Sequence, residues 1–353
     1  MLADLEALVK LESPTEDLQS CRDVIALANE IATRVLGTPA EIREVNGRPV
    51  FWWGSANPDV VVLAHLDTVW PKGSFEPLWQ VEGTAARGPG IFDMKAGFIQ
   101  ALYAMKGITG SAALIATTDE ETGSVTSKEF IKEISAKAKA VLVLEATLNG
   151  KVKTGRKGTA MYQVKIHGKA SHAGLEPEKG ANATTEIAHA VLAIAGMENP
   201  EHGTTVVPTT LHAGNTTNTV PDLAVLDIDI RSYSMADLQR VDAAIKALKP
   251  VNTNTRYEIT GGFNRPPLET SSTMALYERA EKVAKSLGMP PLGHASVGGA
   301  SDGNFAAAAG AQVLDGLGAV GAGAHAAHEW VDISTLEDRS TLLNALIKDL
   351  LNE

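Results

Sequence analysis

The sequence predicts an α/β fold interrupted by a smaller α+β domain, and three observations support this prediction. Short apolar runs recur along the N-terminal half and are separated by segments with helical spacing of apolar residues. From Lys157 onward, apolar and polar residues alternate instead, which is typical of half-buried strands. The 353 residues, of which 44% are hydrophobic, exceed one typical domain and suffice for a substantial core.

Several segments outside the alternating region have the spacing of helices. The first two are separated by Ser13-Pro14-Thr15, and Gly37 is expected to end the second. Another starts near Asp93 and runs to about Met105. The first two helices are predicted at 2–11 and 18–36, and the remaining ones at 127–136, 271–287 and 335–352. We expect these helices to pack against a central sheet.

Three apolar runs are predicted to be buried strands, and each ends in a histidine or a carboxylate. They begin at Val60, Ala112 and Ala140. His65, the acidic turn Asp119-Glu120-Glu121, and Glu145 follow them in that order. In open α/β sheets, ligands bind just outside such strand ends, so these polar residues predict a functional site.

The alternating region predicts a separate inserted domain. A strand at 161–167 is followed by a helix at 182–195, strands at 204–212 and 224–233, a helix at 235–248 and a strand at 256–261. This β-α-β-β-α-β order is ferredoxin-like. We therefore expect residues 157–266 to form an inserted domain within a discontinuous domain made of 1–156 and 267–353.

Composition narrows the possible partners and location. A net charge of -11 without a lysine or arginine block argues against nucleic acid and anionic membranes as partners. The sequence shows neither a basic leader nor about 20 uninterrupted apolar residues, so we expect a cytoplasmic protein. The single cysteine, Cys21, rules out an intrachain disulfide. An anionic substrate would need a local basic pocket.

The acidic turn indicates a metal site. Asp119, Glu120 and Glu121 should repel one another unless a cation neutralises them, although a solvated acidic turn is the alternative. From the residues alone, the possible metal ligands are His65, Asp93, Glu121, Glu145 and either His325 or His328. Glu120 is not among them. Such ligands suit zinc, manganese or cobalt, and the lack of a cysteine cluster argues against structural zinc.

Two further roles follow from the same pattern. Asp67 lies two residues after His65 on the same strand face and could hold the second imidazole nitrogen. Asp93, for which a helix-capping role is the alternative, is the best candidate for a ligand shared by two ions. A pair of ions about 3.5–4 Å apart polarises a carbonyl and makes hydroxide available near neutral pH. Glu120 could then carry the proton to the leaving amine.

Several motifs in matching order show that the chain resembles the M20 family of di-zinc metallopeptidases, most closely its glutamate carboxypeptidase branch. The resemblance runs nearly end to end. It rests on Ala64-His-Leu-Asp-Thr-Val-Trp-Pro-Lys-Gly73, Gly88-Pro-Gly-Ile-Phe-Asp-Met-Lys-Ala-Gly97, Thr118-Asp-Glu-Glu-Thr-Gly-Ser124, Gly168-Lys-Ala-Ser-His-Ala-Gly174, Asn218-Thr-Val-Pro221 and Gly323-Ala-His325.

The resemblance implies a zinc-exopeptidase-like catalytic domain with a mixed sheet flanked by helices, and a lid through which a homodimer forms. One zinc would be held by His65, Asp93 and Glu145, and the other by Asp93, Glu121 and His325. Asp67 would orient His65, Glu120 would be the general base and acid, and His172 would reach the partner subunit's site to stabilise the oxyanion. The residues implied in substrate binding are Asn218, Arg231, Arg265 and the backbone at Gly298 and Gly299.

The implied reaction is hydrolysis of an amide bond to a C-terminal amino acid in a small peptide or N-acyl amino acid. A deacylase of the acetylornithine or succinyl-diaminopimelate type is the alternative within the family. Gly299-Ala-Ser301-Asp-Gly303 matches a serine nucleophile motif, but 292–297 makes a poor strand before it. A non-catalytic metal-binding protein is a further alternative. Gly155-Arg-Lys-Gly158 resembles a lid hinge, with an ordinary charged turn as its alternative.

Overall fold

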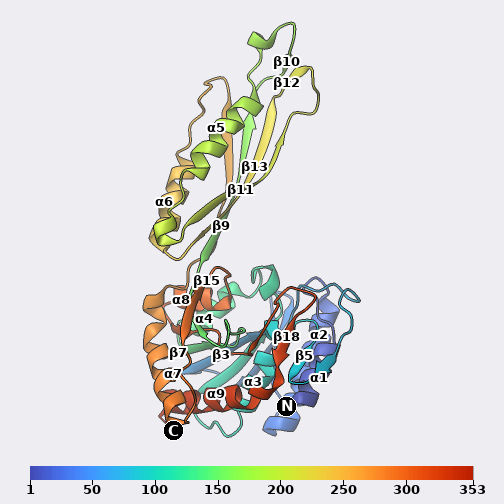
Figure 1. The fold of residues 1–353 in the computed structure, drawn as a ribbon, viewed down its shortest axis with the longest axis vertical. Helices are drawn as coiled ribbons and strands as arrows, with labels where there is room; N and C mark the ends of the chain where they lie inside the picture. The colour runs from blue at the N-terminus through green and yellow to red at the C-terminus, as the bar shows by residue number, and fades with distance from the viewer. Residues whose placement is uncertain (353) are drawn as a thin grey trace. The chain divides into compact units, whose positions relative to one another are not determined.

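A computed structural model describes residues 1–352 and divides the chain into two compact units (Figure 1). Unit 1 comprises Met1–Arg156 and Leu268–Glu353, and unit 2 comprises Lys157–Pro267. Each unit has its own hydrophobic core.

Unit 1 is built on a six-stranded mixed sheet with the order β1-β2-β6-β3-β7-β16. Strand β3 is parallel to β6 and β7, and β16 is parallel to β7, whereas β2 is antiparallel to β6. The carboxyl ends of β6, β3, β7 and β16 therefore meet at one edge. The strands are β1 Glu41–Val45, β2 Arg48–Gly54, β3 Val60–His65, β6 Ala112–Thr117, β7 Ala140–Val143 and β16 Gln312–Leu314.

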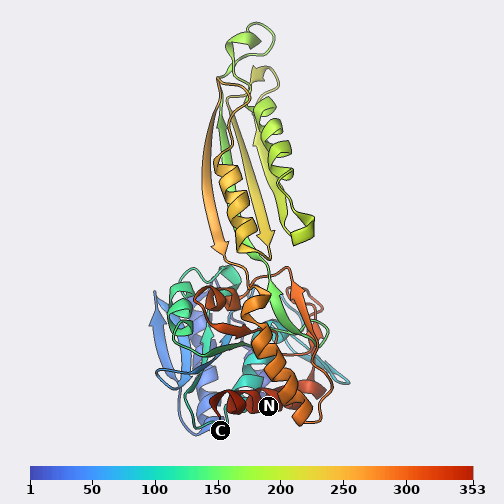
Figure 2. The same ribbon diagram turned by 90° about the vertical axis from the view of Figure 1, so that its left-hand side faces the viewer.

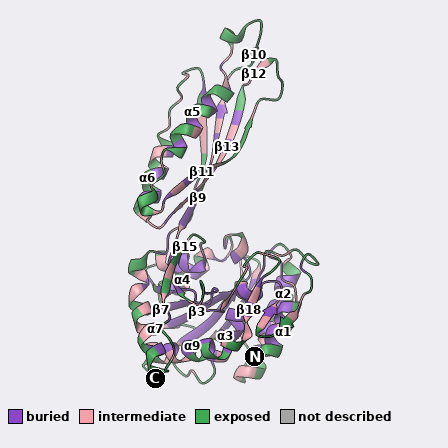
Figure 3. Cartoon of the chain, viewed as in Figure 1, coloured by how far each residue is buried: buried purple, intermediate pink, exposed green. Residues whose placement is uncertain are grey.

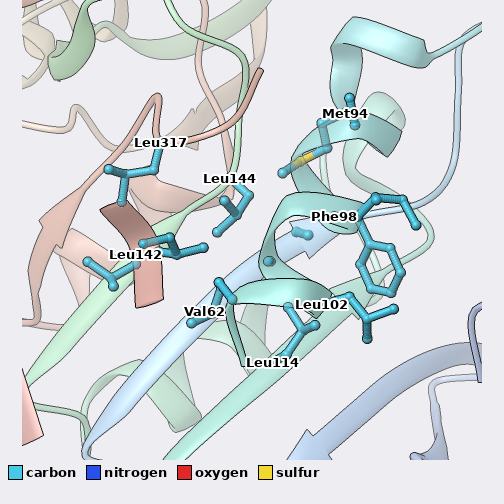
Figure 4. Packing of buried hydrophobic residues seen from close by; sticks show 14 of the residues in the cluster. Val62, Met94, Phe98, Leu102, Leu114, Leu142, Leu144 and Leu317 are labelled. Carbon is cyan, nitrogen blue, oxygen red and sulfur yellow. The ribbon is translucent and has the colours of Figure 1, made fainter. Parts of the chain in front are cut away.

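Helices cover both faces of this sheet because its central strands are apolar on both sides. Val62 and Leu114, which are in register on β3 and β6, face α3 and α9. Phe98 and Leu102 of α3 pack in the same cluster (Figure 4). Val61 and Leu63 face the layer that contains α4 and α8. The helices of unit 1 are α1 Leu2–Lys10, α2 Leu18–Leu36, α3 Ala96–Ala104, α4 Lys128–Ser135, α7 Met274–Ser286, α8 Asp302–Ala308 and α9 Leu336–Leu351.

Short strands that the sequence pattern did not predict complete unit 1. A four-stranded sheet has the order β17-β18-β5-β4, and β15 pairs in parallel with β8. The expectation that 292–297 makes a poor strand was wrong for residues 294–297, which form β15 although its side chains are not fully buried. These strands are β4 Gln80–Glu82, β5 Ala85–Arg87, β8 Val152–Arg156, β15 His294–Val297, β17 Gly321–Ala322 and β18 Trp330–Asp332.

Unit 2 has a four-stranded antiparallel sheet with the order β11-β13-β9-β14. Helices α5 and α6 pack on one face of it (Figures 1 and 2). Its main elements follow the predicted β-α-β-β-α-β order, and the small β10–β12 pair is an addition. They are β9 Gly158–His167, β10 Ser171–His172, α5 Ala183–Ala195, β11 Thr205–Ala213, β12 Thr219–Val220, β13 Leu223–Ser232, α6 Met235–Lys246 and β14 Arg256–Arg265.

Burial follows these layers. The central strands of unit 1 are buried throughout, and the strands of unit 2 alternate between buried and more accessible residues (Figure 3). Within residues 1–352, no helix combines the length and the apolar character needed to cross a bilayer.

Candidate metal centre

Three predicted donors lie at the carboxyl edge of the central sheet because their strands are adjacent and parallel. His65 is the last residue of β3, Glu121 lies in the single helical turn Glu120–Thr122 that follows β6, and Glu145 comes shortly after β7. The three apolar runs that end in a histidine or a carboxylate thus bring these side chains to one location in the structure.

The donors form two clusters that share Asp93. One consists of His65, Asp93 and Glu145 and the other of Asp93, Glu121 and His325, with the donor atoms of each within 4.8 Å of one another. His65 Nε2 lies 3.4 Å from Asp93 Oδ1 and 3.7 Å from Glu145 Oε1. His325 Nε2 lies 3.2 Å from Asp93 Oδ2 and 3.0 Å from Glu121 Oε2. Such a geometry can present one carboxylate to two ions.

Asp93 is held by a residue that the sequence reasoning missed. It lies in the segment Ile91–Lys95 before α3, where its own backbone is not helical (φ -119°, ψ 88°), and it does not cap that helix. Glu329 is fully buried, and its carboxylate accepts the backbone N–H groups of Gly90, Phe92 and Asp93 at 3.0, 2.8 and 3.0 Å. Trp70 Nε1 also donates to Glu329, at 3.3 Å.

Asp67 connects His65 to the acidic turn. His65 Nδ1 lies 3.1 Å from the backbone oxygen of Asp67 and 3.4 Å from its Oδ1. The Asp67 carboxylate also accepts the backbone N–H groups of Glu120 and Glu121, at 3.3 and 3.2 Å, and the Thr15 hydroxyl at 2.8 Å. One buried carboxylate therefore fixes both the imidazole and the turn that carries Glu120.

Asp119 has a different task from its two acidic neighbours. Its buried carboxylate accepts the backbone N–H and the hydroxyl of Thr126, both at 2.7 Å, and the Ser127 hydroxyl at 2.6 Å. These bonds brace the loop that leads into α4. Asp119 is absent from both donor clusters.

Glu145 lies beside a buried arginine that sequence reasoning considered only as part of a hinge. Arg156 Nη2 lies 3.3 Å from Glu145 Oε2, and its guanidinium makes a bidentate ion pair with Asp315, at 2.7 and 3.0 Å. Asp315 follows β16 at the same sheet edge. Arg156 Nη1 also donates to the backbone oxygens of Gly299 and Ala300, both at 3.2 Å.

The electrostatics of the clusters favour a bound cation. Burial, reinforced by the charge of Asp93, raises the pKa of Glu121 to about 8 and that of Glu145 to about 7. The carboxylates of Asp93 and Glu121 raise the pKa of His325 to about 11. These shifts arise because carboxylates are crowded together, and divalent cations bound between them would relieve their mutual repulsion.

Unpartnered atoms supply a direct test of whether these residues fit a metal. Among the described residues, His65 Nε2 and Glu121 Oε1 are buried and have no hydrogen-bond partner. Buried polar atoms are rarely left without one, and both residues belong to the clusters. Imidazole and carboxylate donors without cysteine suit zinc, cobalt or manganese, so the donor chemistry fits as well.

The glycine-rich loop favours one of its two histidines. His325 has a φ of 61° and follows Gly323, whose φ is 85°, so the loop turns sharply there. This conformation brings His325 into the second cluster, and His328 is in neither cluster. His328 is therefore not a competing donor in this geometry.

Ser301 is placed for structure and not for nucleophilic attack. Its hydroxyl donates to Asp315 Oδ2 at 2.7 Å and accepts the backbone N–H of Gly303 at 3.1 Å, which caps α8. The residue is fully buried. Gly298 and Gly299, just before it, are exposed.

The four predicted residues of unit 2 form two separate pairs. His172 pairs with Thr219 across β10 and β12, and the adjoining Ala173 N–H donates to the backbone oxygen of Asn218 at 2.9 Å. Arg231 and Arg265 are instead the neighbours of Thr159 on either side of β9. The His172 ring is exposed, whereas Arg265 is buried.

Comparison with known proteins identifies the class. The model of Peptidase family M20/M25/M40 matches residues 61–349. The fold and this match define a metallopeptidase, which is an amide hydrolase. The chain belongs to the M20 family.

Individual relatives agree with this assignment. Carboxypeptidase G2 of Pseudomonas sp. (strain RS-16) is 34% identical over 316 residues, which cover 84% of this chain and 75% of that protein. Succinyl-diaminopimelate desuccinylase of Sulfurovum sp. (strain NBC37-1) is 26% identical over 317 residues, covering 83% and 84%. The crystal structure of aminopeptidase PepT from Bacillus cereus ATCC 10987 has a TM-score of 0.81 at 22% identity and covers 99% of this chain and 97% of its own, a likeness of fold.

Proposed function

We propose that this chain is a carboxypeptidase-like hydrolase that cleaves the amide bond to a C-terminal amino acid, with glutamate as the first candidate. The observation that carries the proposal is the sharing of Asp93 by two clusters of three donors. The 34% identity to carboxypeptidase G2 supports a C-terminal amino acid as the leaving group. The substrate would be a small peptide or an N-acyl amino acid.

Two divalent ions complete the site in this proposal. His65, Asp93 and Glu145 hold one, and Asp93, Glu121 and His325 hold the other. Zinc is the first candidate, with cobalt and manganese as alternatives. When bound, the ions polarise the scissile carbonyl and lower the pKa of water.

Glu120 serves as general base and then as general acid. Its backbone N–H is fixed by Asp67, so the turn that carries it keeps its position relative to His65. Only 9% of the residue is exposed, which limits its contact with bulk water. Its carboxylate takes a proton from the attacking water and delivers it to the leaving amine.

Unit 2 would act as lid and dimerisation domain. Arg231 and Arg265 offer guanidinium forks for the substrate carboxylate, although Arg231 already has an ion pair of 2.9 Å with Asp229. His172 Nδ1 accepts the backbone N–H groups of Gly174 and Leu175, both at 3.1 Å. These bonds keep the proton on Nε2, which can then donate to an oxyanion.

The separation of the two pairs within unit 2 supports a homodimer. The arginines flank Thr159, whereas His172 and Asn218 lie beyond His167 at the other end of β9. The strand between Thr159 and His167 is about 26 Å long at about 3.3 Å per residue, longer than a dipeptide. One unit 2 therefore cannot bring both pairs to the same small substrate. A site that takes His172 and Asn218 from a partner subunit resolves this difficulty.

Exposed Gly298 and Gly299 present backbone groups near Arg156, and we assign them to substrate contact. We place the protein in the cytoplasm, where its free Cys21 would stay reduced. Deacylation of the desuccinylase type is the second candidate, because those relatives are about a quarter identical to the chain.

A substrate screen with metal-reconstituted enzyme tests the proposal. Dipeptides and N-acyl amino acids would be compared at equal concentration, with glutamate, ornithine and diaminopimelate as leaving groups. We expect the glutamate series to be hydrolysed best and a chelator to abolish turnover. A lack of hydrolysis of every compound by fully metallated enzyme would refute the proposal, and preference for succinyl-diaminopimelate would establish the alternative.

A further inference from the structure

Arg156 is a buried arginine to which the proposed function gives no role. It is the last residue of β8 and is only 3% exposed. Its guanidinium makes four hydrogen bonds and one ion pair, which matches the five N–H groups of an arginine side chain. No N–H group is left for a substrate anion. Any effect of Arg156 on the reaction therefore passes through the residues that it contacts.

Glu145 is the first of these residues. Its Oε2 lies 3.3 Å from Arg156 Nη2, whereas its Oε1 lies 3.7 Å from His65 Nε2 in the first donor cluster. Within residues 1–352, no other side chain makes an ion pair or a hydrogen bond with Glu145. Arg156 thus takes up one carboxylate oxygen and leaves the other for a metal ion. The direction in which that oxygen points depends on the guanidinium.

The loop before α8 is the second contact. Arg156 Nη1 donates to the backbone oxygens of Gly299 and Ala300, both at 3.2 Å. Because a trans peptide is planar, the N–H groups of Ala300 and Ser301 point away from the guanidinium. The Ser301 N–H donates to Asn304 Oδ1 at 2.9 Å, whereas no group in the described part of the chain accepts the Ala300 N–H. The orientation of this free N–H group therefore also depends on Arg156.

Asp315 holds the guanidinium in place. Its carboxylate is fully buried and accepts Arg156 Nε and Nη2 at 2.7 and 3.0 Å. Asp315 itself belongs to neither donor cluster. Removal of one partner from a buried ion pair is strongly destabilising, but a lysine keeps the positive charge and lacks the planar fork. Arg156→Lys therefore separates the orienting effect of the fork from the effect of its charge.

We propose that Arg156 is a positioning residue with two tasks. It orients Glu145 toward one metal ion, and it orients the Ala300 N–H toward the substrate. The inference rests on the proposed function and adds a link within it, because one side chain holds both a metal donor and the substrate-facing loop. The two donors that belong only to the second cluster make no ion pair with Arg156. Loss of the fork should therefore weaken one ion and spare the other.

Metal binding tests the first task without any substrate. Apoenzyme would be titrated with cobalt, and the absorption spectrum and the metal content per chain would be recorded. We expect Arg156→Lys to bind one ion about 10- to 100-fold more weakly and the other as in wild type. The spectrum of the remaining ion should match that of Glu145→Gln and differ from that of His325→Ala. Two ions bound as in wild type, or both weakened alike, would overturn the inference.

Two further variants complete this test. Arg279→Lys is the matched control, because this guanidinium pairs with Asp349 at the surface, and it should bind both ions as wild type does. Asp315→Asn should reproduce the selective loss, and the double variant with Arg156→Lys should lose little more than either single variant, because both changes act through one contact. Full additivity of the two losses would show that Asp315 does not act through the guanidinium.

Kinetics at saturating metal test the second task. With N-benzoyl-glutamate as substrate, we expect Arg156→Lys to raise KM roughly fivefold, the equivalent of one hydrogen bond, and to leave kcat close to wild type. An unchanged KM would overturn the orientation of the Ala300 N–H toward the substrate. If wild-type enzyme hydrolysed no amide, the proposed function would fail, whereas the selective loss of one ion would still support the first task. A wild-type chain that binds no pair of ions would overturn both.

Discussion

Glu329 Oε1 accepts the backbone N–H of Asp93 at 3.0 Å, although the two residues are 236 positions apart in the chain. Glu329 lies four positions after His325, on the loop that carries this histidine. One buried carboxylate thus joins the donor shared by both clusters to the segment that supplies a donor to the second. We propose that Glu329 is a positioning residue for the candidate metal centre.

Glu329→Gln should weaken metal binding without removing a donor. The amide oxygen can still accept backbone N–H groups, but the amide nitrogen faces donors such as Gly90 or Trp70 that it cannot satisfy. Loss of such support typically costs about 10- to 100-fold in metal affinity. Titration of apoenzyme with cobalt, followed by its absorption spectrum, measures the change. The control is Glu337→Gln, an exposed position on α9, and an affinity equal to that of wild type in Glu329→Gln would contradict the assignment.

Removal of metal should destabilise unit 1 as well as stop turnover. Without cations, Asp93, Glu121 and Glu145 remain close together with little access to solvent, and the pKa values of the two glutamates are raised there. A ligand present at a 1,000-fold excess over its Kd stabilises the folded state by about 4 kcal/mol. We expect a chelator to lower Tm and zinc or cobalt to restore it. A Tm that does not respond to metal would argue against binding at these donors.

Much of the site could be predicted because its residues follow local patterns. His65, Glu121 and Glu145 each come after an apolar run, and parallel strands bring such ends together. Glu329 and Arg156 leave no such pattern, because the hydrogen-bond partners of their side chains are 143 or more positions away in the chain. Their roles depend on tertiary contacts that a single sequence does not display.

The fold was predicted best where elements are long and periodic. The helices of unit 1 and the ferredoxin-like order of unit 2 have clear spacing, whereas the two- and three-residue strands are too short to show one. The β1–β2 hairpin was missed despite a usable signal. Asn46-Gly47 joins the two strands with φ values of 49° and 85°, and Asn-Gly is a strong hairpin turn sequence.

Glu120→Gln should reduce kcat strongly and leave metal content intact. Glu120 belongs to neither donor cluster, and the substitution keeps its size while removing its capacity to carry a proton. General acid–base catalysis contributes typically about 10² to 10⁴ in rate. Steady-state kinetics together with metal analysis of the same samples measures both quantities. Normal kcat at full metal occupancy would exclude the proposed proton transfer.

Mixing two inactive variants should restore activity if each site uses His172 of the partner subunit. In a heterodimer of Glu120→Gln and His172→Ala, one site lacks both groups and the other has both. Random exchange makes half of the dimers mixed, so roughly a quarter of wild-type activity should return. Activity after denaturation and joint refolding measures this recovery, with each variant refolded alone as the control. No recovery, despite demonstrated heterodimers, would show that His172 does not act across subunits.

Glu186 should stabilise unit 2 at neutral pH and lose this effect in acid. It is 1% exposed on α5, and its carboxylate accepts the Val251 and Asn252 backbone N–H groups at 2.7 and 2.8 Å and the Tyr257 hydroxyl at 2.7 Å. Burial raises the pKa of Glu186, but these hydrogen bonds outweigh burial and hold it below the ordinary value of 4.5.

The direction of this pH dependence follows from proton binding to the folded and unfolded chains. Because the folded pKa is the lower one, the unfolded chain binds more protons as pH falls below about 4.5, so the stabilisation is complete above that pH and is lost below it. Glu186→Gln should therefore cost about 2 kcal/mol at pH 7, as expected for lost charge-assisted hydrogen bonds, and progressively less in acid. Hydrogen exchange of the Val251 and Asn252 amides in the full chain measures the difference locally, and exposed Glu198→Gln is the control. A cost for Glu186→Gln that stayed constant from pH 7 to pH 3 would show that the carboxylate charge contributes nothing to holding this loop.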